Sequence, residues 1–224
     1  DHYIASRAFQ EFKKNAVTRS ASPAWVDLGP YSADNISEGY NPGIGRIECF
    51  EVNRQNPDQL YMGSRSGGFW RTMDGGNTWK EVFRNDDPAI FLDAIDFDGK
   101  KGICLGDPIN NWFYFLSTNN KGDSWKEIKN KNNLAPDSTY AFAASGSAMQ
   151  LLDGKTIIFG TGGKNASIFC SDNFGKNWKI SKTPMVAGKQ SEGIFSIDFP
   201  TKYHGLIGGG DYLNPDIMNT NLFY

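Results

Sequence analysis

Three copies of one eight-residue pattern constrain the fold of this chain more than any other feature. Each copy has Ser or Thr first, Asp or Asn third, Gly fifth and Trp eighth. The copies begin at Thr72, Thr118 and Ser171, so they start 46 and then 53 residues apart. A pattern that recurs at this distance, with several apolar runs in each unit, is typical of repeat architectures such as β-propellers.

The eight residues have the chemistry of a tight hairpin turn. The glycine allows a positive φ, the Asp or Asn oxygen accepts hydrogen bonds from backbone N–H groups of the turn, and the tryptophan begins the next strand and fills the gap toward a neighbouring element. We therefore interpret the pattern as structural. Its positions are Thr72, Asp74, Gly76 and Trp79, then Thr118, Asn120, Gly122 and Trp125, then Ser171, Asn173, Gly175 and Trp178.

The rest of each unit repeats as well. An apolar run that ends in glycine precedes each copy, at 60–63, 103–106 and 157–160, and a fourth run, at 206–209, has no copy after it. Upstream of each lies a further apolar run, separated from it by turn residues such as Asp98-Gly99 and Asp153-Gly154. Asp-Gly between apolar runs indicates a hairpin. Each unit thus predicts four short antiparallel strands, with blades at about 45–85, 90–132, 140–185 and, incomplete, 190–224.

The eight-residue pattern resembles the Asp-box, or BNR, repeat of sialidases, sortilin-type ectodomains, xyloglucan-cleaving hydrolases and photosystem II assembly-factor-like propellers. The first copy matches that repeat fully, whereas Asn120 and Asn173 replace its Asp in the other two. The resemblance implies an all-β propeller of four-stranded antiparallel blades. Such propellers usually have more blades than the four represented here, so we expect part of a larger ring. We expect 25–30 to be a closing strand and 1–24 a leader or short helix.

Composition excludes several classes of function. The net charge is −2, which leaves no basic surface for nucleic acid, and no apolar stretch approaches the ~18 residues of a membrane span. The chain has only two histidines, so we expect no His-based triad and no His-rich metal site. No phosphate-cradling glycine loop precedes a predicted helix, so we expect no dinucleotide cofactor. We expect the three cysteines, which lie in predicted strands of different blades, to be buried free thiols.

The face of the propeller opposite the Asp-boxes, called the loop face below, is the predicted ligand-binding surface. This face is formed by the loops after the glycine-ended strands and by the loops between blades. The candidate ligand-binding residues there are Arg65, Asp86, Asp107, Lys164, Asp211 and Tyr212. Asp107 and Asp211 each follow a strand-ending glycine by one or two residues. They are the alternative catalytic pair of a glycoside hydrolase, although acidic residues at such places more often cap turns.

These observations favour a non-catalytic binding or assembly scaffold. By resemblance we expect an extracytoplasmic propeller that presents its loop face to a protein or a glycan, with its oligomeric state open. The alternative is a secreted glycoside hydrolase that uses carboxylates of the loop face. It would not be a typical sialidase, because such enzymes grip a carboxylate with arginines from several blades and this chain has no arginine after Arg84.

Overall fold

The structure is a computed structural model, and it describes residues 47–53, 56–64, 68–129, 132, 135–143, 146–216 and 221–224. Within these ranges the regular elements are all β-strands, and there is no α-helix. The predicted closing strand at 25–30, the leader at 1–24 and the candidate ligand residue Arg65 lie outside the described residues.

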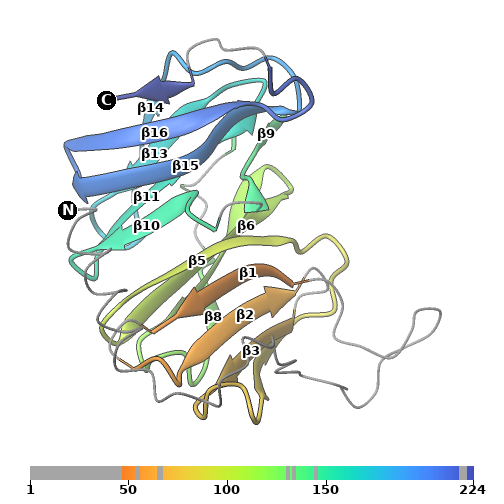
Figure 1. The fold of residues 1–224 in the computed structure, drawn as a ribbon, viewed down its shortest axis with the longest axis vertical. Helices are drawn as coiled ribbons and strands as arrows, with labels where there is room; N and C mark the ends of the chain where they lie inside the picture. Colours follow the sequence, from red (N-terminus) through yellow and green to blue (C-terminus); the bar gives the residue numbers. More distant parts are fainter. Residues whose placement is uncertain are drawn as a thin grey trace, which may run out of the picture.

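Three sheets have four antiparallel strands each, and these strands are consecutive in the first two sheets, whereas β12 intervenes between the second and third strands of the third sheet (Figure 1). The first contains β1 (Ile47–Val52), β2 (Leu60–Ser64), β3 (Gly68–Thr72) and β4 (Lys80–Arg84). The second contains β5 (Leu92–Asp98), β6 (Lys101–Ile109), β7 (Trp112–Thr118) and β8 (Lys126–Glu127). The third contains β10 (Met149–Leu152), β11 (Thr156–Gly160), β13 (Ser167–Ser171) and β14 (Lys179–Lys182). The predicted all-β fold of four-stranded antiparallel blades is confirmed.

The fourth sheet differs from the other three because it takes strands from the preceding unit. Its order is β17 (Leu222–Phe223), β16 (His204–Asp211), β15 (Glu192–Thr201), β12 (Gly162–Gly163) and β9 (Thr139–Tyr140). The last two fall within the stretch 140–185, or directly beside its start, which the sequence assigns to the third blade. Glycine makes this pairing possible, because a Cβ at Gly162 would lie 2.3 Å from the Glu192 carbonyl oxygen.

The sheets follow one another along the long axis of the molecule in chain order, from β1–β4 at the bottom of Figure 1 to β15–β17 at the top. Apolar side chains fill the space between successive sheets. One buried cluster joins the first and second sheets and includes Tyr61, Phe69, Leu92 and Trp125. A second joins the second and third sheets around Phe113, Phe115, Phe159 and Phe169, and a third joins the third and fourth around Ile158, Ile194 and Ile197. The sheets are thus packed face to face as blades.

Candidate functional site

The three Asp-boxes form equivalent turns with the geometry that their spacing predicts. In the first box the Thr72 hydroxyl donates to Asp74 Oδ1 at 2.7 Å and accepts from the Gly76 N–H at 3.0 Å. Asp74 Oδ1 also accepts from the Thr78 N–H at 2.9 Å. Gly76 has a φ of 92°. The second and third boxes repeat these contacts through Asn120 and Asn173, whose amide oxygens accept from the backbone N–H four residues later.

The second box also attaches its blade to the one before it. The Tyr61 hydroxyl, from β2, donates to the Lys121 carbonyl oxygen at 2.7 Å, and Gln59 Nε2 donates to the same oxygen at 3.0 Å. Burial raises the pKa of Tyr61 to about 12, so the phenol keeps its proton and remains a donor. Arg71 forms an ion pair with Asp123 at the same junction. The second box therefore stabilises the contact between the first and second blades.

The tryptophans of the second and third boxes fill the gaps between blades. Trp125 is 5% exposed, and its ring centroid lies 4.5 Å from that of Phe69 in the first sheet. Trp178 stacks on Phe115 of the second sheet at 5.3 Å with an interplanar angle of 16°. Each tryptophan thus packs against the preceding blade, which is a structural role.

On the loop face, Asp107 holds a neighbouring segment of backbone. Its Oδ1 accepts a hydrogen bond from the Ala141 N–H at 3.2 Å, although the two residues are 34 positions apart. Burial raises the pKa of Asp107 to about 6, an effect that the Ala141 hydrogen bond reduces. The fully buried Asp93 of β5 lies near enough for its pKa to be raised by Asp107, after the larger effect of its own burial. The Asp107 carboxylate thus accepts a hydrogen bond from the Ala141 backbone, and its pKa is raised.

Asp211 caps a turn. Its Oδ1 accepts from the Leu213 N–H at 3.0 Å and its Oδ2 accepts from Asn214 Nδ2 at 2.7 Å. Lys189 Nζ lies 3.4 Å from Asp211 Oδ2 and 2.9 Å from Glu192 Oε1. Hydrogen bonds hold the pKa of Asp211 well below its usual range; the bond from the Ser191 side chain has the largest effect, followed by the bond from the Asn214 side chain. Asp211 therefore remains ionised and fully engaged in its own turn.

The other candidates on the loop face divide into two groups. Tyr212 lies with the segment that Asp107 holds, because its ring centroid is 6.4 Å from that of Phe142. Lys164 pairs with Asp137 at 3.4 Å, next to the same segment. Asp86 is not part of this group, since it forms an exposed ion pair with Arg84 at 2.7 Å. The segment around β9 therefore links Asp107, Lys164 and Tyr212, whereas Asp86 belongs to the linker after β4.

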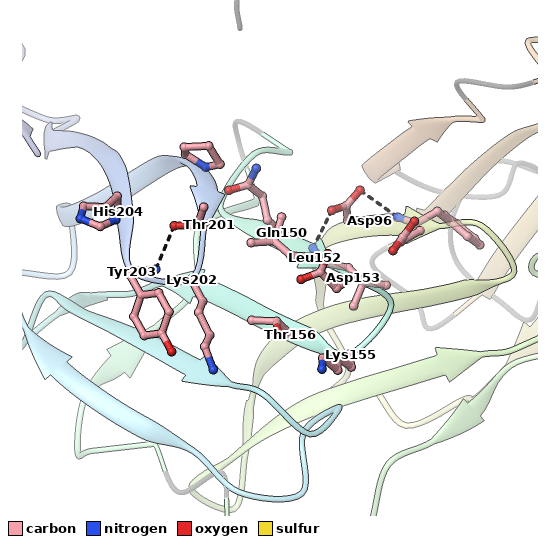
Figure 2. Close-up of a pocket in the computed structure, with 14 residues that line it drawn as sticks. Asp96, Gln150, Leu152, Asp153, Lys155, Thr156, Thr201, Lys202, Tyr203 and His204 are labelled. Atoms are coloured by element: carbon pink, nitrogen blue, oxygen red, sulfur yellow. Dashed lines mark hydrogen bonds between the residues drawn. The ribbon is translucent and has the colours of Figure 1, made fainter.

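A large hollow lies at the opposite end of the blades, on the hairpin face, which we define as the side of the Asp-boxes and of the turns at 98–101, 153–155 and 201–203. The Phe174 N–H of the third box donates to the Lys155 carbonyl oxygen at 2.7 Å, which places boxes and turns at one end. A groove of about 890 Å³ crosses this face from the second to the fourth sheet (Figure 2).

Polar side chains of three successive blades line the groove (Figure 2). Asp96 stands on the side of the second blade, where its Oδ2 accepts from the Leu151 N–H at 2.7 Å. Gln150 and Lys155 come from the third blade, and Gln150 Oε1 accepts from the Phe199 N–H at 2.6 Å. On the fourth blade, Lys202 lies 5.1 Å from the centroid of the Tyr203 ring, which is 77% exposed. Two hydrogen bonds thus join neighbouring blades beside the groove, and its edges carry charged and aromatic groups.

The sequence identifies the turns that edge this groove but not the groove itself. Asp98-Gly99-Lys100, Asp153-Gly154-Lys155 and Pro200-Thr201-Lys202 occur at the same place in successive units. Because these turns recur at the same place in each unit, they are expected to lie on one face. This recurrence is the sequence signal that could have predicted the groove. Among the described residues, no three His, Cys, Asp or Glu side chains gather so that they could hold a metal ion. A search of the same residues finds no helix that could span a membrane.

Comparison with known proteins assigns the chain to a family. The sequence pattern of the family described as photosynthesis system II assembly factor YCF48 matches residues 47–161, just over half of the chain. The chain belongs to this family. The matched stretch runs from β1 of the first blade to the end of β11 in the third, so it contains two complete blades and two Asp-boxes of this YCF48-family protein.

Similar proteins include both assembly factors and hydrolases. Xyloglucanase Xgh74A of Acetivibrio thermocellus is 26% identical over 142 residues, 63% of this chain and 13% of the enzyme, so the chain spans about an eighth of that relative. The structure of YCF48 from Cyanidioschyzon merolae is 16% identical, covers 72% of this chain and 49% of that one, and has a TM-score of 0.49. The structure of the GH74 xyloglucanase from Xanthomonas campestris is 13% identical, and the match covers 78% of this chain and 28% of the enzyme, with a TM-score of 0.52. The last likeness shows the propeller fold alone.

Proposed function

We propose that this chain is a non-catalytic scaffold on an extracytoplasmic propeller, and that it binds an extended segment of a protein partner in the groove of the hairpin face. The observation that carries the proposal is the groove itself, which is continuous across three blades and held open by hydrogen bonds between them. Membership of a family described as assembly factors supports a protein partner. Loops on a rigid scaffold are the usual place for binding.

The shape and chemistry of the groove suit a peptide. An extended chain presents backbone donors and acceptors along its whole length and side chains to both sides. The groove offers Asp96 and Asp153 toward the second and third blades, and Lys202 and the exposed Tyr203 ring on the fourth. Lys202 forms an ion pair with Asp172 at 3.4 Å, and Lys155 also lines the groove, so we expect the exposed Tyr203 ring to be the main anchor for an aromatic or apolar side chain of the bound segment.

A glycan is the second candidate ligand. It is favoured by the aromatic and carboxylate groups around the 139–142 segment of the loop face, where Tyr212 lies beside Phe142. Sugars stack on aromatic rings and bond to carboxylates. Location outside the cytoplasm is part of this proposal and rests on the resemblance to exported Asp-box propellers.

The hydrolase alternative has one observation in its favour, the raised pKa of Asp107, which suits a general acid. A second carboxylate must then act as base or nucleophile. Asp211 is poorly placed for that work, because the turn at 211–214 and Lys189 use both of its oxygens. The geometry therefore favours binding over catalysis.

The test is selection of peptides from a random display library on the immobilised protein, followed by binding measurements on the selected peptides. Lys202→Ala combined with Tyr203→Ala changes the exposed edge of the groove without touching the core, and it is expected to weaken binding at least tenfold. Asp86→Ala and Lys164→Ala, exposed on the other face, are the matched controls and are expected to bind normally. Equal binding by all variants would exclude the groove.

A parallel assay separates the alternatives. The protein is incubated with a panel of glycans, and both retention and hydrolysis are measured for the unaltered chain and for Asp107→Asn. Turnover that disappears in a folded Asp107→Asn protein would replace the scaffold by a hydrolase. Retention without turnover, lost in Tyr212→Ala, would make a glycan the ligand.

A further inference from the structure

The innermost strand of every sheet carries a polar residue that is paired with an apolar residue of the second strand. These pairs are Glu51 with Tyr61, Asp96 with Ile103, Gln150 with Ile158 and Asp198 with Leu206. In the first three sheets the apolar member belongs to the buried cluster that is shared with the next sheet. The pairs are therefore equivalent positions of the repeat, and the pair in the fourth sheet marks its outer face, which points away from the third sheet.

This outer face of the fourth sheet has apolar side chains that no neighbouring sheet covers. Leu206 is 42% exposed, whereas its equivalents in the first three sheets are at most 1% exposed. Leu222 of β17 is also exposed and lies on the same face, because the adjacent Phe223 packs on the opposite side, against the cluster that joins the third and fourth sheets. The outer face thus has the apolar residues of a blade-to-blade contact.

The polar member of the pair provides a hydrogen bond to the next sheet at two junctions. Asp96 accepts from the Leu151 N–H at 2.7 Å, and Gln150 accepts from the Phe199 N–H at 2.6 Å. Asp198 occupies the same position in the fourth sheet, and its side chain is exposed. The series therefore predicts that Asp198 accepts a backbone N–H from a strand that covers the outer face.

The first sheet has an exposed face of the opposite kind, which is the face that would pack against a preceding sheet. Phe50, the residue before Glu51, is 47% exposed. Its equivalents in the other sheets pack against the preceding sheet or beside it and are at most 4% exposed; they are Ile95, Met149 and Ile197. The outer faces of the first and fourth sheets lie at opposite ends of the long axis (Figure 1).

The first sheet also has a backbone donor in the required place. Val52, paired with Leu60, is the equivalent of Leu151, which is paired with Ile157 and donates to Asp96. The Asn53 N–H donates to the Gln59 carbonyl oxygen. Because N–H groups alternate in direction along a strand, the Val52 N–H points away from β2, toward the free edge of the sheet.

We propose that two copies of this chain associate head to tail, with the fourth sheet of one copy packed on the first sheet of the other. Leu206 and Leu222 cover Phe50 of the second copy, and the Val52 N–H of that copy donates to Asp198. The contact repeats the junctions inside the chain. It is heterologous, so a dimer that uses both pairs of faces contains two such junctions and eight sheets, which is within the range of about 4–8 blades in propellers. This inference does not depend on the ligand of the groove.

The first test is the oligomeric state of the unaltered chain, measured by analytical ultracentrifugation at micromolar concentrations. A dimer is expected, and a monomer would overturn the proposal. Leu206→Asp and Phe50→Asp should each give a monomer, because each places a charge in both junctions. An equimolar mixture of the two variants should form a heterodimer through the one junction that neither substitution alters, which also shows that both variants are folded.

Ile180→Asp is the matched control. Ile180 is 47% exposed, as Phe50 is, but it lies in β14 of the third sheet, away from both outer faces. This variant should remain a dimer. A dimer that survives either Leu206→Asp or Phe50→Asp alone, or variants that stay monomeric when they are mixed, would refute a head-to-tail contact.

A substitution of Asp198 tests the register of the contact. Asp198→Ala removes the acceptor and should raise the dissociation constant of the dimer about tenfold or more. Asp198→Asn should bind almost normally, because the amide oxygen of Gln150 serves in the equivalent place. Equal dissociation constants for Asp198→Ala and the unaltered chain would contradict the proposed contact.

Discussion

Replacement of Gly122 by alanine tests whether the second Asp-box docks on the preceding blade. Gly122 has a φ of +75°, and a Cβ there would lie 2.4 Å from Cε1 of Tyr61. Tyr61 cannot move aside easily, because it is 1% exposed and its ring stacks on Phe97 at 4.1 Å. The substitution therefore combines backbone strain with a clash against a fixed ring.

The expected magnitude follows from three contributions. A left-handed φ costs a residue with a Cβ about 1–2 kcal/mol, and overpacking of a filled site costs about 1–3 kcal/mol. The Tyr61 hydrogen bond to the Lys121 carbonyl is lost when the ring moves, at about 1 kcal/mol. We expect Gly122→Ala to lower the free energy of unfolding by about 3–6 kcal/mol.

Gly99→Ala is the matched control. Gly99 also has a positive φ, +61°, but a Cβ there would meet no atom within 4 Å. Gly99→Ala should therefore lower the free energy of unfolding only through backbone strain, by about 1–2 kcal/mol. Urea unfolding measures both, and an unchanged m value shows that the transitions are comparable.

The comparison of the two variants decides the matter. If Gly122→Ala lowers the free energy of unfolding no more than Gly99→Ala does, the inference that the second box packs against Tyr61 is wrong. A double-mutant cycle with Tyr61→Leu localises the effect, because removal of the aromatic ring should recover part of the loss and give a coupling energy of about 0.5–3 kcal/mol.

Three further predictions concern the boxes and the loop face. Trp125→Ala should lower the free energy of unfolding by about 3–5 kcal/mol in the same urea assay, because it leaves a cavity between two blades. Hydrogen bonds, of which that from the Thr78 side chain has the largest effect, lower the pKa of Asp74 to about 2. Asp74 therefore stabilises the fold above about pH 4, and this contribution is lost as the pH falls from about 4 to 2. In Asp74→Asn the melting temperature should change less over that pH range, and the fold should persist because Asn occupies the same position in the other two boxes. The pKa of Asp107 is instead raised to about 6, so ionisation costs stability as pH rises from about 4 to 6, and Asp107→Asn should remove that decline while its amide oxygen still accepts from Ala141.

Much of the blade structure follows from local sequence. The Ser or Thr, the Asp or Asn and the glycine of each box interact within eight residues, so their hydrogen bonds depend on little else. The runs that end in Gly63, Gly106 and Gly160 correspond to β2, part of β6 and β11. Local turn chemistry therefore predicts the hairpins and their order.

The candidate site depends on contacts that local sequence does not contain. Asp107 holds Ala141, and β12 pairs with Gly193 of the next unit, across 34 and 31 positions of the chain. The pairing of β12 with Gly193 requires two glycine backbones to approach closely, which a pattern of apolar runs does not reveal. The sequence analysis placed binding on the loop face, whereas the groove lies among the hairpin turns at the other end.

The sequence by itself determined the Asp-box turns, the four-stranded repeat and the small net charge of −2, because each depends on residues close together in the chain or on composition alone. Tertiary structure decided which turns edge the groove and which carboxylates are engaged in caps. The physical reason is that rotation and packing of one blade against the next set these distances, and side chains far apart in the chain share that packing.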